Sequence, residues 1–155
     1  MNFSKKTLWI NIALLFALNL STPALAKTDS FTFGHPGKTT EAARTIHITA
    51  LDIRFTPTIL DVLAGETIRF MVTNKGLLIH EFVIGDAKEQ ASHEKEMQRM
   101  QGMPMPDEAN AITLKPGETK SLVWTFSAAK TVAFACHQPG HYAAGMIGKI
   151  FVKPQ

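Results

Sequence analysis

The sequence predicts an all-β protein, a β-sandwich that carries one short helical insertion. Short runs of alternating apolar and polar residues recur from residue 44 onward, and turns bearing glycine or proline separate them. Such runs are typical of half-buried strands in two packed sheets. One stretch, residues 87–101, breaks the alternation because it lacks β-branched residues and is rich in helix formers.

The first 26 residues have the layout of a secretory signal peptide. Lys5 and Lys6 precede an apolar run over residues 8–20, and the small-residue triplet Ala-Leu-Ala ends at Ala26. This layout predicts export to the periplasm with cleavage after Ala26. A membrane anchor is the alternative, but the run is shorter than the roughly 20 apolar residues that a spanning helix needs. We therefore expect no membrane span after cleavage.

The charge balance gives no reason to expect nucleic acid as a partner. The whole chain has a net charge of +3, but Lys5 and Lys6 belong to the predicted leader. Without them, 14 basic residues stand against 13 acidic ones. The apparent basicity is therefore largely a targeting feature.

The exported part divides into a lead-in and one domain. Residues 27–43 are polar, contain glycine and proline, and are expected to be a flexible N-terminal segment. The domain is expected over residues 44–155. Its expected strands are 44–50, 61–66, 67–73, 78–84, 121–126, 131–136 and 146–152. Turns are expected at Ala64-Gly65 and over residues 115–118.

The helical insertion is expected over about residues 87–105. Asp86 can cap its start, and Gly102 with Pro104 can end it. It would lie between two strands of the sandwich.

A C-terminal segment carries a metal-binding pattern. Cys136, His141 and Met146 have the spacing C-x4-H-x4-M, and Cys136 is the one cysteine of the chain. Exported domains usually pair their cysteines, so a lone one suggests another use. A thiolate, an imidazole and a thioether select copper, and two His with one Cys and a weak axial Met form a blue-copper site. Zinc is disfavoured because it prefers four Cys or His ligands.

A second histidine ligand is then required, and strand alternation selects His80. His80 shares a strand face with Phe82 and Ile84, whereas Cys136 shares one with Val132 and Phe134. Both side chains are therefore expected to point into the sandwich. The predicted copper ligands are His80, Cys136, His141 and Met146.

Residues 134–153 closely resemble the copper loop of the cupredoxins, above all the rusticyanin and auracyanin branch, which shares C-x4-H-x4-M. The resemblance implies a Greek-key sandwich, a single type 1 copper ion and one-electron transfer. It also implies that His80, Cys136 and His141 are equatorial ligands and that Met146 is axial. Residues 78–86, followed by the insertion, resemble the periplasmic copper-resistance cuproproteins of the CopI type.

Two neighbours of the ligands depart from the family pattern. Many cupredoxins place Asn after the first histidine ligand, where it ties the ligand loops together, but this chain has Glu81. The contact that links the two ligand loops is therefore expected to differ in this chain. His137, next to the ligand cysteine, is also unusual; we expect it to be exposed to solvent, and a functional role is the alternative.

The insertion carries an unusual set of soft ligands. His93, Met97 and Met100 recur at i, i+4 and i+7 on one helical face, and Met103 and Met105 follow. The commoner role of such a stripe is packing against the sandwich. The functional alternative is a second Cu(I) site or a docking surface, since thioethers suit Cu(I).

Two functions remain open, and neither is enzymatic. The first is an electron carrier whose redox partner docks on small residues around His141. The second is a copper-tolerance protein, including a copper-sequestering variant with a second Met/His Cu(I) site and no dedicated redox partner. A multicopper oxidase is disfavoured because the sequence has no H-x-H pair, and no Ser/His/Asp arrangement suggests hydrolysis.

Overall fold

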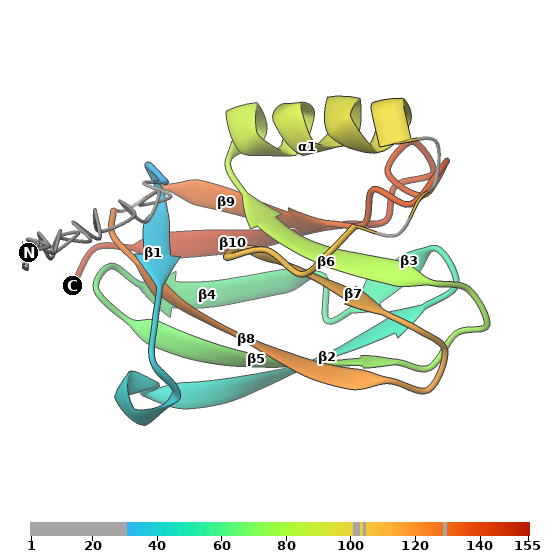
Figure 1. Ribbon diagram of the computed structural model, residues 1–155. Helices are drawn as coiled ribbons and strands as arrows, with labels where there is room; N and C mark the ends of the chain where they lie inside the picture. Colours follow the sequence, from blue (N-terminus) through green and yellow to red (C-terminus); the bar gives the residue numbers. More distant parts are fainter. Residues whose placement is uncertain (1–30, 101–102, 104, 129) are drawn as a thin grey trace, which may run out of the picture.

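The computed structural model describes residues 31–100, 103, 105–128 and 130–155, and Figure 1 shows their arrangement. Two five-stranded sheets pack face to face, which confirms the predicted sandwich. The predicted signal peptide lies outside the described residues. Among the described residues, no helix is both long and apolar enough to cross a membrane.

The first sheet has the strand order β1-β8-β5-β2-β3. Its strands are β1 (Gly34–Pro36), β2 (Arg44–Leu51), β3 (Arg54–Thr56), β5 (Thr67–Asn74) and β8 (Thr119–Phe126). The pair β2/β5 is parallel and the other pairs are antiparallel. A short 3-10 helix, η1 (Thr39–Glu41), lies between β1 and β2.

The second sheet has the order β4-β10-β9-β6-β7 and carries the predicted metal ligands. Its strands are β4 (Ile59–Leu63), β6 (His80–Gly85), β7 (Ala111–Leu114), β9 (Thr131–Ala135) and β10 (Ile147–Lys153). The pair β4/β10 is parallel, and β9 is paired with both β10 and β6. Because β6 and β9 are neighbours, His80 and Cys136 come from adjacent strands.

The space between the sheets is filled by large apolar side chains. Phe82 and Phe134 pack with ring centroids 5.2 Å apart, and Phe55 meets both rings edge-on. Gly148 of β10 lies directly under Phe134, since a Cβ there would come 2.0 Å from the ring. The close backbone approach anchors β9 just before Cys136.

The insertion forms one helix, α1 (Ala87–Met100), which lies across the second sheet over β6 and β9. Asp86 caps it as expected: its Oδ1 accepts the N–H groups of Lys88 and Glu89, both at 3.1 Å. The helix is polar, and the face that it buries carries Gln90, His93 and Met97.

Part of the N-terminal segment expected to be flexible over residues 27–43 packs on the first sheet. Phe33 is 1 % exposed and stacks on Trp124 of β8, with ring centroids 5.1 Å apart. β1 then pairs with β8. Aromatic burial therefore outweighs the glycine and proline content of this stretch. The sequence did not predict the three-residue strands β1 and β3 or the four-residue strand β7. Three or four residues are too few to display an alternating pattern.

Candidate metal centre

Three of the four predicted ligands converge at one end of the sandwich. His80 begins β6, Cys136 follows β9 directly, and His141 lies in the loop between β9 and β10. His80 and Cys136 are fully buried, whereas His141 is 8 % exposed. One histidine is thus enclosed and the other reaches the surface.

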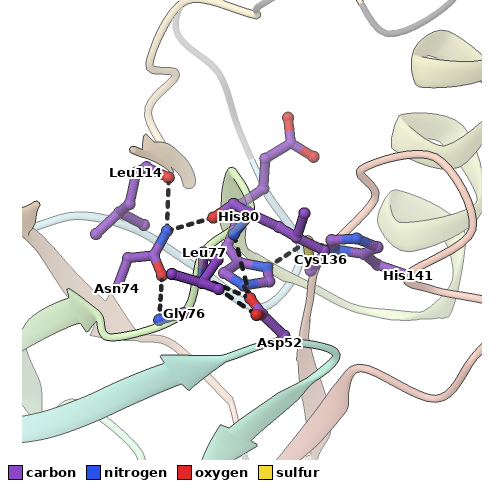
Figure 2. Close-up of polar contacts among 10 residues, drawn as sticks. Asp52, Asn74, Gly76, Leu77, His80, Leu114, Cys136 and His141 are labelled. Carbon is purple, nitrogen blue, oxygen red and sulfur yellow. Dashed lines mark hydrogen bonds and ion pairs between the residues drawn. The ribbon is translucent and has the colours of Figure 1, made fainter. Parts of the chain in front are cut away.

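The ligand atoms of these residues face one another. The Nδ1 atoms of His141 and His80 lie 3.3 Å and 3.9 Å from the Cys136 Sγ. All three ligand atoms lie within 4.8 Å of one another. Figure 2 shows the side chains of His80, Cys136 and His141 gathered at one place. Two imidazoles and one thiolate are the equatorial set that suits copper.

Met146 closes the ligand loop. Its backbone carbonyl accepts the N–H of Cys136 at 3.1 Å, and its own N–H donates to the His141 carbonyl at 3.0 Å. Its side chain is fully buried. Gly140 and Gly145 have φ values of 84° and 89°, which glycine adopts without strain. The loop geometry therefore brings Met146 back beside Cys136.

Burial controls the protonation of the ligands. Burial raises the pKa of the Cys136 thiol to about 12. The backbone N–H groups of Glu81 and Gln138 lower this pKa, but their effect is smaller than that of burial. The residue therefore stays a thiol until a bound cation displaces its proton. Burial also lowers the pKa of His80 and of His141, which favours the neutral imidazoles that a metal requires.

Asp52 supports His80 from the turn between β2 and β3. Its Oδ1 lies 3.3 Å from His80 Nε2, opposite the nitrogen that faces the sulfur. The carboxylate also accepts the N–H groups of Leu77 and Leu78 at 2.9 Å and 3.2 Å (Figure 2). Burial alone would raise the pKa of Asp52, but these donors hold it below its ordinary value. Asp52 thus fixes both the ring and the loop before it.

Neither Asp52 nor its role was predicted from the sequence. It sits in a turn 28 residues before His80 and belongs to no spacing motif. Gly76 offers a retrospective signal, because a Cβ there would come 2.1 Å from the Asp52 Oδ1. A glycine in this loop is therefore required for the carboxylate to approach.

His137 is buried, not exposed as expected. It is 2 % exposed and lies under α1, where Glu94 and Gln90 contact its two ring nitrogens. Glu81, expected to alter the tie between the ligand loops, keeps a backbone tie: its N–H donates to the Cys136 Sγ at 3.3 Å. Its side chain turns away toward His93.

The five residues of the expected second site occupy different surroundings. His93 and Met97 are buried beneath α1, at 5 % and 2 % exposure, whereas Met103 is 57 % exposed. Met97 lines a cavity with Glu94 and His137, and Met105 lines another with Asp107 and Lys120. Met100 is half-buried. The structure therefore supports packing for part of this set.

Comparison with known proteins gives a consistent family. Residues 42–153 match the family model described as copper binding proteins of the plastocyanin/azurin family. The "Copper-resistant cuproprotein CopI" of Pseudomonas aeruginosa is 34 % identical over 180 aligned positions, covering 98 % of this chain and 99 % of that protein. The protein of the same name from Rubrivivax gelatinosus is 38 % identical, covering 78 % of this chain and 73 % of its own.

Solved structures of auracyanins have the same fold. Auracyanin B matches with a TM-score of 0.65 and 28 % identity, over 78 % of this chain and 95 % of its own. The reduced auracyanin of Roseiflexus castenholzii matches with a TM-score of 0.64 and 29 % identity, over 73 % of this chain and 99 % of its own.

Proposed function

Since the chain belongs to the plastocyanin/azurin family of copper-binding proteins, we propose that His80, Cys136 and His141, together with Met146, would hold one type 1 copper ion. The observation that carries this proposal is the convergence of two Nδ1 atoms on a buried cysteine sulfur. Copper would supply one-electron redox chemistry there. The protein's own part is to hold the ligands in one geometry and to exclude water.

The arrangement suits electron transfer through one side of the molecule. His141 is the ligand that reaches the surface, and Pro139, Gly140, Ala143 and Ala144 surround it in the loop. Small side chains let another protein approach the imidazole closely. A redox partner would dock here, with His141 as the exit for the electron.

Ligand assignment can be tested by copper retention. The mature protein should keep one equivalent of copper after desalting, and Cys136→Ala and His141→Ala should lose it. His47→Ala is a suitable control because His47 is an exposed histidine on β2. Copper retained equally by all four proteins would contradict the assignment.

We further propose that the protein acts in copper tolerance in the periplasm. The support is the likeness to proteins named copper-resistant cuproproteins, one of which matches along 98 % of this chain. Deleting the gene should sensitise cells to copper without harming respiration, and the wild-type gene should restore growth where Cys136→Ala does not. A respiratory defect at low copper would instead favour a dedicated electron carrier.

A copper-sequestering role with a second Cu(I) site is the alternative. Met97 supports it, since this buried thioether lines a cavity beside His137 and the copper loop. Titration with Cu(I) should then give more than one equivalent per chain. A stoichiometry of one, unchanged by replacing Met97, Met100, Met103 and Met105, would remove this alternative.

A further inference from the structure

Each of the three converging ligands is followed in sequence by a residue on the helix side of the second sheet. Glu81 follows His80, His137 follows Cys136, and Tyr142 follows His141. Glu81 and His137 are each 2 % exposed. Together with Gln90, His93 and Glu94 of α1, these three residues form what we call the helix-side cluster.

His137 is held on three sides in this cluster. Its Nδ1 lies 2.7 Å from Glu94 Oε2, and its Nε2 lies 2.6 Å from Gln90 Oε1. The ring of Tyr142 stacks on it, with centroids 4.6 Å apart and 17° between the planes. The residue after one ligand is therefore locked both to α1 and to the residue after another ligand.

Gln90 connects α1 to both ligand-bearing strands. Its Nε2 donates to the carbonyls of Val83 in β6 and Ala133 in β9, at 3.0 Å and 3.2 Å. This fixes the amide so that its Oε1 faces His137. Both ring nitrogens of His137 thus face oxygen acceptors. A neutral imidazole donates a hydrogen bond to one of them, and only an imidazolium donates to both.

The second link joins α1 to the residue after His80. His93 Nε2 and Glu81 Oε2 lie 3.8 Å apart, and neither atom has a hydrogen-bond partner among the described residues. Both side chains are almost fully buried. The two side chains therefore face each other in a buried site, where a polar group without a partner is unfavourable.

We propose that α1 is a positioning element for the copper centre, acting through Glu81, His137 and Tyr142 on the three ligands that precede them. His80 and Cys136 lie on different strands, so their relative placement depends on what holds β6 and β9 together. The helix-side cluster spans both strands and the ligand loop. It thereby replaces the tie between ligand loops that the Asn after the first histidine ligand makes in many cupredoxins.

The cluster is not assigned as a second metal site. Within the described part of the chain, the one group of three His, Cys, Asp or Glu ligand atoms within 4.8 Å is His80, Cys136 and His141. Both nitrogens of His137 are also engaged by oxygen acceptors. The inference rests on the proposed copper site and concerns its second layer of contacts.

Glu94→Gln tests the link to His137, with Glu96→Gln as the matched control on an exposed position of the same helix. Second-layer partners of metal ligands are worth about 10- to 100-fold in metal affinity. Because Glu94 contacts His137 and not a ligand, Glu94→Gln should raise the copper Kd by at most about tenfold. It should also change the relative intensities of the visible thiolate-to-copper bands, while Glu96→Gln leaves both as in the wild type.

The double variant Glu81→Gln/His93→Gln tests the second link and replaces both ionisable side chains together, so that neither is left without its partner. It should shift the same bands and the reduction potential relative to the wild type. The unfolding midpoint of the copper-free protein is measured in parallel. Copper affinity that falls only in step with that midpoint would overturn the positioning role.

Three results are decisive. Bands and Kd unchanged in both variants would overturn the inference while leaving the copper site intact. A wild type that binds two copper ions, one of which is lost in the double variant, would replace the inference with a second metal site. A wild type without any thiolate-to-copper band would overturn the proposed function itself.

Discussion

At the scale of single residues, the contact between Asp52 and His80 has the most direct bearing on the copper. Asp52 accepts from the ring nitrogen that points away from the sulfur. A carboxylate in that position fixes the tautomer of the histidine, orients the ring and makes the other nitrogen a stronger donor. A stronger donor favours Cu(II) over Cu(I). Asp52 should therefore lower the reduction potential of the site.

Asp52→Asn should raise the reduction potential and weaken copper binding about tenfold, because an amide is a poorer acceptor than a carboxylate. Protein-film voltammetry and chelator competition would measure the two effects. Asp61→Asn serves as the control, since Asp61 lies on β4 and contacts Lys153 at the surface. A potential that is unchanged or lowered in Asp52→Asn would contradict this role.

At the scale of elements, α1 depends on Asp86 at its start. The Asp86 carboxylate caps the helix and also accepts from the Thr32 hydroxyl at 2.5 Å, with Lys130 at 3.6 Å. Residues from the N-terminal lead-in and from the loop before β9 thus meet at one helix end. These contacts tie the segment around Thr32 to the start of α1.

Asp86→Ala should lower the free energy of unfolding by about 1 kcal/mol through loss of the cap. Urea unfolding of the copper-free protein would measure this change. Asp86→Asn should retain most of the stability, because asparagine caps helices about as well as aspartate. Equal stability of the alanine variant and the wild type would show that the cap is dispensable.

At the scale of the whole molecule, an ion pair links β2 to the turn after β4. Arg44 donates from Nε to Glu66 Oε1 at 2.8 Å and from Nη2 to the Asp61 carbonyl at 2.7 Å. Hydrogen bonding to Arg44 is the main reason that the pKa of Glu66 is lowered in the folded protein. Arg44 therefore joins β2 of the first sheet to β4 of the second sheet and to the turn that follows β4.

This pair should make stability depend on pH in the acid range. The Glu66 pKa is lower in the folded protein than its ordinary value of 4.5, so its contribution is complete above pH 4.5. It is lost as the pH falls through the lowered folded value. In Glu66→Gln, unfolding midpoints measured below pH 4.5 should fall less steeply than in the wild type. An identical slope in both proteins would contradict the linkage.

Local patterns accounted for much of the fold and part of the site. The alternation of apolar and polar residues predicted the longer strands. The spacing from Cys136 to Met146, together with the strand face of His80, predicted four ligands, of which His80, Cys136 and His141 converge in the structure. The contacts of Asp52 and Gln90 could not be predicted, because they join turns and a helix to distant strands. His137 was misjudged as exposed because α1 covers it, which strand alternation cannot reveal.

The central claim is that a cysteine thiolate binds copper at Cys136 between two histidines. The visible absorption spectrum of the copper-loaded protein tests it most directly, with Cys136→Ala measured alongside. We predict an intense thiolate-to-copper charge-transfer band in the wild type and its complete loss in Cys136→Ala. A wild-type spectrum with only the weak bands of copper bound by nitrogen and oxygen would contradict the account.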